Sequence, residues 1–328
     1  MTALIDSWQR QINYLRISVT DLCNLSCVYC SAGSIPRLSH DDILRYEEIQ
    51  RIVRIAAGMG ITKVRLTGGE PLARPDFVKL VKMISGVKGI DDVAVTTNGI
   101  LLAKLADDLK AAGLNRVNVS LDTLKPVRFK QITGGDRLLD VLAGIEAAHR
   151  VGLEPVKINA VVMRGKNDDE ILDFARKTIT DGWHVRFIEF MPFGTCGTDS
   201  VETVPTSEIY ERIQAIGKLE PFAGPAGNGP AKYFQFPGTK GSVGFITPMT
   251  EHFCATCNRL RITSDGQLRP CLLGNDEISL KQALRSGAND DEIKKLIQHA
   301  VAIKREEHHL SGELAPEVIN RPMSQIGG

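Results

Sequence analysis

The chain has 328 residues, a length that suits one barrel-sized domain with a smaller companion and argues against a single small domain. Its 40 lysines and arginines balance 39 aspartates and glutamates, so overall charge gives no argument for a nucleic acid or an anionic membrane as a partner. The first residues lack the basic segment and apolar run of a signal peptide, and no later stretch has the roughly 18 apolar residues of a membrane helix, which predicts a soluble, cytoplasmic protein.

Short runs rich in apolar and β-branched residues recur along the chain and predict buried strands. They cover residues 14–20, 63–69, 93–99, 116–122, 155–163 and 184–191. Amphipathic patterns between the strands predict helices, which cover residues 47–60, 101–113, 138–152 and 168–180. This succession of strands and helices indicates a parallel sheet with right-handed crossovers, either doubly wound or barrel-like.

Unusual residues at the ends of the predicted strands decide between these two folds. Cysteines follow the first strand, and the others end in GGEP, in TTNG, at Ser120 and Asp122, and at Met191. In a barrel, the carboxyl ends of all strands meet at one mouth, whereas a flavodoxin-like sheet gathers its site at one switch point. The spread over nearly all strands favours an incomplete, TIM-like (βα)6 barrel in the α/β class.

The composition changes after residue 220 and predicts a domain boundary there. Residues 219–248 are rich in glycine and proline and show no helical period. Two helices are then expected, over 279–287 and 290–309, and the chain ends in IGG. The first domain therefore spans 1–220 and the smaller C-terminal domain spans 221–328.

The first cysteine group consists of Cys23, Cys27 and Cys30, spaced C-x3-C-x2-C. Three thiolates in one loop suit a 4Fe-4S cluster, because they ligate three irons and leave the fourth open for chemistry. A zinc ion with a distant fourth ligand, or three thiols with no metal, are the alternatives. Since zinc motifs usually pair two C-x2-C groups, the spacing favours the cluster.

The second cysteine group consists of Cys254, Cys257 and Cys271, spaced C-x2-C-x13-C. It suits a second open cluster, although His252 could complete a zinc site with three cysteines. Arg259 and Arg261 lie two residues apart, so they share one side of an extended segment. Unless these arginines are simply solvated, they indicate a phosphorylated substrate beside the cluster. The seventh cysteine, Cys196, is interpreted as a loop thiol without a role.

The first cysteine group, with Tyr29 before its last cysteine and GGEP at Gly68–Pro71, resembles the signature of the radical S-adenosylmethionine (SAM) enzymes. The resemblance implies that SAM chelates the open iron. One electron from the cluster would then split SAM and give a 5'-deoxyadenosyl radical. The positions that match the SAM site of these enzymes are Tyr29, Gly68, Gly69, Glu70, Ser120 and Met191.

The whole series of motifs is similar to the GTP 3',8-cyclase family of molybdenum cofactor biosynthesis. It runs in the same order from about Leu15 to Gly328 and includes RLTGGEP, TTNG, NVSLD, CATCNRLR and the terminal IGG, with no motif between about Gly194 and Gly241. The resemblance implies a lyase with two 4Fe-4S clusters, in which the radical takes the 3' hydrogen of GTP and the sugar carbon attacks C8 of guanine. A reductant would supply electrons, and cyclic pyranopterin monophosphate synthase would use the product.

The resemblance also implies residues for each role. The three cysteines of the first group, with Arg259 and Arg261, would act in catalysis, and the second cluster would bind the guanine. GTP would contact Arg16, Arg65, Thr96, Lys157, Arg259, Leu260 and Arg261. The tail residues Gly327 and Gly328 would reach the active site.

Three of these cations point to a ligand even without the resemblance. Arg16, Arg65 and Lys157 each interrupt an otherwise apolar strand. A buried cation needs an anionic partner, unless it lies at an exposed strand edge. No Walker motif appears, so the site differs from that of a GTPase.

Two other functions stay open from the residues alone. One is a radical SAM enzyme with an auxiliary cluster that acts on a peptide. The other is an iron-sulfur carrier or a zinc-binding interaction protein. The oligomeric state is also open, and a homodimer is among the possibilities.

Overall fold

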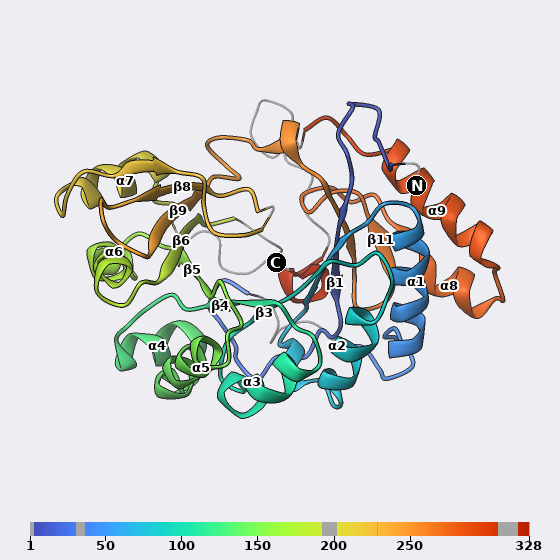
Figure 1. Cartoon of the computed structure of the whole chain (residues 1–328), viewed down its shortest axis with the longest axis horizontal. Helices are drawn as coiled ribbons and strands as arrows, with labels where there is room; N and C mark the ends of the chain where they lie inside the picture. The colour runs from blue at the N-terminus through green and yellow to red at the C-terminus, as the bar shows by residue number, and fades with distance from the viewer. Residues whose placement is uncertain (1–2, 31–36, 192–201, 228, 308–320, 328) are drawn as a thin grey trace.

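The predicted strands form the centre of one curved sheet in a computed structural model that describes residues 3–30, 37–191, 202–227, 229–307 and 321–327. These six strands are neighbours in chain order and pair in parallel (Figure 1). They are β1 (Tyr14–Ser18), β2 (Lys63–Thr67), β3 (Asp92–Thr97), β4 (Arg116–Ser120), β5 (Lys157–Val162) and β6 (His184–Glu189).

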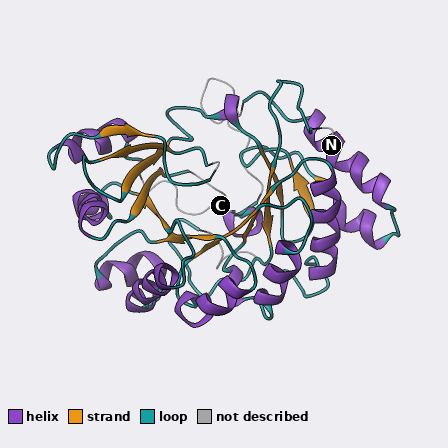
Figure 2. Ribbon diagram, in the orientation of Figure 1, coloured by secondary structure: helices purple, strands orange, loops and turns teal. Residues whose placement is uncertain are grey.

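Helices connect these strands and cover the convex side of the sheet (Figure 2). They are α1 (Tyr46–Gly58), α2 (Phe77–Ser85), α3 (Leu102–Ala111), α4 (Pro126–Thr133), α5 (Leu138–Arg150) and α6 (Ile171–Thr180). In α1, Ile49, Ile52, Val53 and Ala56 recur at helical spacing and are all buried, as the sequence pattern predicts.

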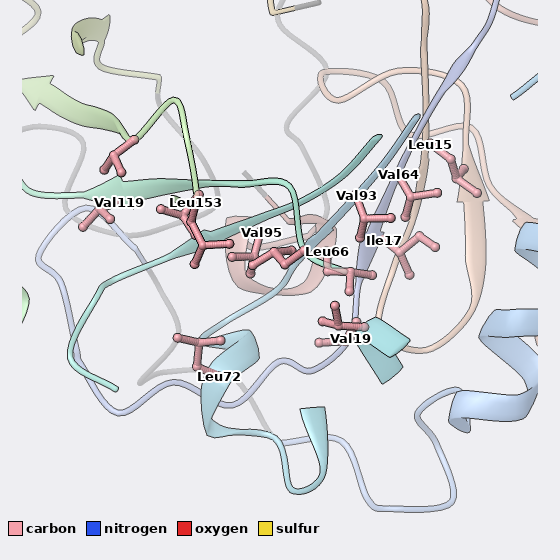
Figure 3. Close-up of a cluster of buried hydrophobic side chains, with 14 of the residues drawn as sticks. Leu15, Ile17, Val19, Val64, Leu66, Leu72, Val93, Val95, Val119 and Leu153 are labelled. Carbon is pink, nitrogen blue, oxygen red and sulfur yellow. The ribbon is translucent and has the colours of Figure 1, made fainter. Parts of the chain in front are cut away.

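The main hydrophobic core fills the space between the sheet and these helices. Figure 3 shows alternate residues of the strands in it, among them Leu15 and Ile17 of β1 and Leu66 of β2. Because successive side chains of a strand point to opposite faces, the residues between them, Arg16 and Arg65, face the concave side. The alternation therefore puts apolar groups outside and cations inside the curve.

The C-terminal part of the chain extends the sheet at both edges. On one side, β9 (Ser242–Ile246) pairs in parallel with β6, and on the other, β10 (Arg259–Ile262) pairs in parallel with β1. Short antiparallel strands follow outward: β8 (Lys232–Gln235) and β7 (Glu220–Phe222) beyond β9, and β11 (Gln267–Arg269) and β12 (Ile278–Ser279) beyond β10. The sequence pattern did not reveal these strands, because strands of two to five residues are too short to show a period and gain their order from distant partners.

The remaining helices are α7 (Thr206–Gln214), α8 (Leu280–Arg285), α9 (Asp290–Ala302) and α10 (Met323–Ile326). The helix predicted over 290–309 is α9, which ends at Ala302. Within the described residues, no helix is long and apolar enough to cross a membrane.

The twelve strands form one open sheet, in which β12 and β7 occupy the two ends of the strand order. This arrangement confirms the incompletely closed, TIM-like barrel and excludes the flavodoxin-like alternative. Since strands from both parts of the chain join in the same sheet, the division at residue 220 stays a prediction.

Candidate active site

The first cysteine group lies in the loop after β1, at the carboxyl end of the barrel. Cys23, Cys27 and Cys30 are half-buried and line one cavity. The loop is fastened to the end of α4, because the amides of Ser26 and Val28 donate to the main-chain oxygens of Thr133 and Ile132, each across 2.9 Å. Burial raises the pKa of Cys23 to about 11, so a metal must displace protons to bind these thiols.

Gly68 and Gly69 have a structural reason to be glycine. The amide of Gly69 donates to the main-chain oxygen of Thr20 across 2.8 Å. A Cβ on Gly69 would lie 2.3 Å from the main-chain oxygen of Leu22, and one on Gly68 would lie 2.3 Å from that of Thr20. The two glycines therefore let the cysteine loop lie directly against the end of β2, and both line the same cavity.

Three other predicted SAM residues, Tyr29, Ser120 and Met191, also line this cavity. The hydroxyl of Tyr29 donates to Oδ2 of Asp122 across 2.5 Å, and the amide of Val161 donates to Oδ1 of Asp122 across 2.8 Å. Burial raises the pKa of Asp122 to about 6, although both hydrogen bonds oppose the shift. The end of β4 thus fixes the ring beside the last cysteine.

The carboxylate of Glu70 is placed differently from what the motif suggests. It accepts hydrogen bonds from Thr97 Oγ1 at 2.7 Å, the Asn98 amide at 2.7 Å and the Leu72 amide at 2.9 Å. It is buried and does not line the cavity with the two glycines. Its side chain therefore fastens the end of β2 to the end of β3, and any contact with SAM would come from its main chain.

The second cysteine group opens onto another cavity, which lies between the cysteines and the concave face of the sheet. Cys254, Cys257 and Cys271 all line it. Burial acts to raise the pKa of Cys257, but the positive charges of Arg259 and Lys304 lower it to about 6. The second group is thus set among cations, unlike the first.

His252 does not complete a zinc site with these cysteines. It is exposed and lies outside the cavity lining. Among the described residues, no three side chains of His, Cys, Asp or Glu are gathered closely enough to hold one metal ion.

Five arginines line the second cavity. Arg16 of β1 lies in register with Arg65 of β2 on one side and with Arg261 of β10 on the other. Arg259 and Arg186 also line the cavity, and its described lining contains no carboxylate. Burial, and then the neighbouring positive charges, lower the pKa of Arg261 to about 10. Such a concentration of buried like charges requires an anion.

The other predicted GTP residues take different places. Thr96 lines the cavity and accepts a hydrogen bond from Arg65 Nη1 across 3.2 Å. Lys157 is buried on β5, where its Nζ donates to the main-chain oxygen of Ala226 across 2.7 Å. The side chain of Leu260 is buried in the main core, so a ligand would reach only its main chain.

Sequence reasoning missed four residues whose polar side chains line this cavity: Tyr14, Asn118, Asn159 and Arg186. Among the described residues, Arg186 Nε, Asn118 Oδ1 and Asn159 Oδ1 are buried without a hydrogen-bond partner. Buried polar atoms of this kind favour a polar ligand. Arg186 interrupts the apolar strand β6 in the way that Arg16 interrupts β1, so the same signal could have found it.

The two cavities adjoin, because Thr96, Asn159, Ile188 and Met191 line both. The tail of the chain also comes to this place, with α10 inside the curve of the sheet (Figure 1). Arg261 Nη1 donates to the main-chain oxygen of Gly327 across 2.6 Å. Two predicted residues, Gly328 and Cys196, lie outside the described part of the chain.

Comparisons with known proteins agree with this geometry. Residues 17–178 match the family model of the radical SAM superfamily, and residues 183–310 match the model described as Molybdenum Cofactor Synthesis C. The crystal structure of Streptococcus suis SuiB bound to S-adenosylmethionine has a TM-score of 0.61 and 17% identity, and covers 87% of this chain and 67% of its own. That likeness shows the fold alone.

Curated relatives extend over the whole chain. The GTP 3',8-cyclase of Moorella thermoacetica is 52% identical over 325 residues, which are 98% of this chain and 99% of the relative. The GTP 3',8-cyclase of Pelotomaculum thermopropionicum is 52% identical over 326 residues, again 98% and 99% of the two chains. The resemblance predicted from the motifs is confirmed, and the chain belongs to the GTP 3',8-cyclase family of radical SAM enzymes.

Proposed function

We propose that this chain converts GTP to 3',8-cyclo-7,8-dihydro-GTP, the first step of molybdenum cofactor biosynthesis. The observation that carries the proposal is the union of two cavities, each lined by a cysteine triad, with five arginines and no described carboxylate in the second. A reductant supplies the electrons, and cyclic pyranopterin monophosphate synthase consumes the product.

The arginine wall suits the triphosphate. Guanidinium groups bind phosphate oxygens in pairs, and the row of Arg261, Arg16 and Arg65 presents three of them from adjacent strands. Arg186 adds positive charge from β6, and Lys157 of β5, whose pKa is lowered to about 6 in the free protein, gains its charge when an anion binds. Anion binding relieves the repulsion among these buried groups, so a substrate with several negative charges gains more than a neutral one.

The first cavity suits SAM beside the first cluster. Bound together there, the two supply a 5'-deoxyadenosyl radical. Gly68 and Gly69 hold the cysteine loop close to β2, while Tyr29 and Ser120 line the wall. Because the two cavities share lining residues, SAM in the first would lie next to the sugar of a nucleotide whose phosphates contact the arginines of the second.

A radical SAM enzyme that acts on a peptide is the second candidate, because SuiB bound to its precursor peptide also resembles this fold, with a TM-score of 0.60 and 16% identity. At that identity the likeness shows the fold alone and gives no information about the substrate. A peptide gives no reason for five arginines at one wall, so the cavity favours the nucleotide.

Anaerobic reconstitution tests the proposal. We expect about eight irons per chain, no zinc, and formation of 5'-deoxyadenosine from SAM and a reductant only when GTP is present. About four irons with one zinc would exclude the second cluster. Cleavage of SAM to the same extent without GTP would argue for another substrate.

A further inference from the structure

Lys304, just beyond the end of α9, is a buried cation outside both cavity linings. Its side chain is 4% exposed. Its Nζ donates to the main-chain oxygens of Pro270, at 2.5 Å, and Arg259, at 3.2 Å, and forms no ion pair with a carboxylate in the described part of the chain. Removing an ammonium from water costs several kcal/mol unless another charge compensates it. The fold therefore places this cation here for a nearby negative charge.

The two oxygens that Lys304 binds lie in the two segments next to the second cysteine group, one after Cys257 and one before Cys271. These segments are called its two arms. Arg259 follows Cys257 by two residues, and Pro270 directly precedes Cys271. One ammonium thus joins the segment after the second cysteine to the segment before the third. This cross-link fixes how far apart the arms stand, and with them the thiols.

Arg10 performs a similar task at the first cysteine of the group. Its Nη1 donates to the main-chain oxygen of Cys254 across 2.8 Å, and the amide of Cys257 donates to the same oxygen across 3.0 Å. The guanidinium is itself held by Asp6, whose Oδ2 lies 2.6 Å from its Nε. A buried ion pair at the start of the chain therefore fixes the turn between two of the cysteines.

The two cations are also fastened to each other through the main chain. Arg10 Nη2 donates to the main-chain oxygen of Arg305 across 2.6 Å, and Trp8 Nε1 donates to that of Lys304 across 3.1 Å. The two segments that carry them, from the beginning of the chain and from the end of α9, therefore form one support behind the cysteine group.

We propose that Lys304 is a positioning residue of the second cluster. Arg10 supports it by fixing the turn that carries Cys254 and Cys257. The ammonium sets the separation of the two cysteine arms and supplies the positive charge that three thiolates on one cluster need. Outer partners of this kind commonly change metal affinity by about 10- to 100-fold when removed. This inference rests on the proposed function, because it takes the second group to hold a cluster.

The test isolates the second cluster by replacing Cys23, Cys27 and Cys30 with Ala. In that background, Lys304→Met is compared with Lys295→Met, a change of the same kind at an exposed position of α9. We expect Lys304→Met to release iron to a chelator about tenfold faster or more, and to shift the midpoint potential of the cluster to a more negative value. Lys295→Met should match the parent. Arg10→Gln should also release iron faster, with a smaller shift in potential.

A complementary background separates positioning from general unfolding. With Cys254, Cys257 and Cys271 replaced by Ala, Lys304→Met should leave iron release from the first cluster unchanged. Faster release from both clusters would overturn the proposal, because it would make Lys304 a general stability element. Equal release and equal potential in Lys304→Met and the parent would also overturn it.

The same experiment distinguishes this inference from the proposed function. If the parent without the first three cysteines binds no iron, the two-cluster function fails before Lys304 is tested. If it binds about four irons and Lys304→Met behaves as the parent does, only the role of Lys304 fails.

Discussion

Arg261, which lines the second cavity, donates from Nη1 to the main-chain oxygen of Gly327 across 2.6 Å and so joins this cavity to the tail. Gly327 has a φ of +78°, and a Cβ there would lie 2.3 Å from Cγ2 of Thr67 at the end of β2. Only glycine combines this backbone conformation with so close an approach. The last turn of the chain therefore fits against the same strand ends that line the first cavity.

We predict that Gly327→Ala displaces the tail and lowers GTP turnover by at least about tenfold, because misplacement by one ångström near a reacting centre has effects of this size or larger. Iron content should stay at the parent level. Gly238→Ala is the matched control, because Gly238 has a φ of +75° with no atom within 4 Å of an added Cβ. Equal turnover in the two variants would contradict a role for the tail.

A second prediction concerns the arginine pair on β10. Replacing both Arg259 and Arg261 with Ala should weaken GTP binding by about 100-fold or more, since each lost hydrogen bond to a charged group costs about 1.5–3 kcal/mol. The comparison variant replaces Arg54 and Arg176, which are more than half exposed, at 58% and 56%. Equilibrium binding experiments under anaerobic conditions measure the GTP affinity of both double variants.

The single variant Arg259→Ala separates phosphate binding from placement of the tail, because Arg261 is the one of these two arginines whose hydrogen bond to Gly327 the described structure shows. It should weaken GTP binding while leaving the tail in place. An unchanged dissociation constant in the double variant, with both clusters present, would remove these arginines from the triphosphate site.

The parts of the site that were predictable are those with a local signal. Cysteine spacing, the GGEP motif and cations such as Arg16 within apolar strands all reside in short stretches of sequence, and the structure brings them to one mouth. The roles of these residues stay predictions. Arg186 carries the same signal as Arg16 and was available to the same reasoning.

The parts that were not predictable depend on partners far away in the chain. Nothing within Arg259–Ile262 shows that it pairs with β1, yet this pairing puts Arg261 in register with Arg16. Glu70 illustrates the same limit. Its motif suggests a ligand contact, but its carboxylate accepts hydrogen bonds from Thr97 and Asn98. Pairing across about 240 residues is decided by the packing of the whole sheet.

A third prediction concerns the contact between Gly69 and the cysteine loop. Gly69→Ala would place a Cβ 2.3 Å from the main-chain oxygen of Leu22, so the loop must move away from β2. With the second cysteine group replaced by Ala, we expect this variant to retain less than about half of the iron of its parent, because ligand geometry is lost. Gly58→Ala, with no atom within 4 Å of the added Cβ, is the control. Full iron content in Gly69→Ala would contradict the prediction.

The final prediction concerns the pH dependence of GTP binding at Lys157. Burial, and then the positive charges of Arg186, Arg116 and Arg65, lower the pKa of this ammonium to about 6 in the free protein. A bound triphosphate replaces repulsion with attraction and raises that pKa, so binding takes up a proton between pH 6 and the raised value. The affinity therefore falls as the pH rises above 6, by up to about tenfold per pH unit from this group.

Titration calorimetry in buffers of different ionisation enthalpy measures this proton directly. Lys157→Met should take up fewer protons than the parent at pH 7 and bind GTP with a flatter pH profile, since the titrating group is gone. The exposed Lys218→Met provides the control for loss of one lysine. Because free GTP carries the same protons in all three experiments, the difference in proton uptake between Lys157→Met and the other two proteins isolates the effect of Lys157. If Lys157→Met and the parent take up the same number of protons, the ammonium is not coupled to the triphosphate.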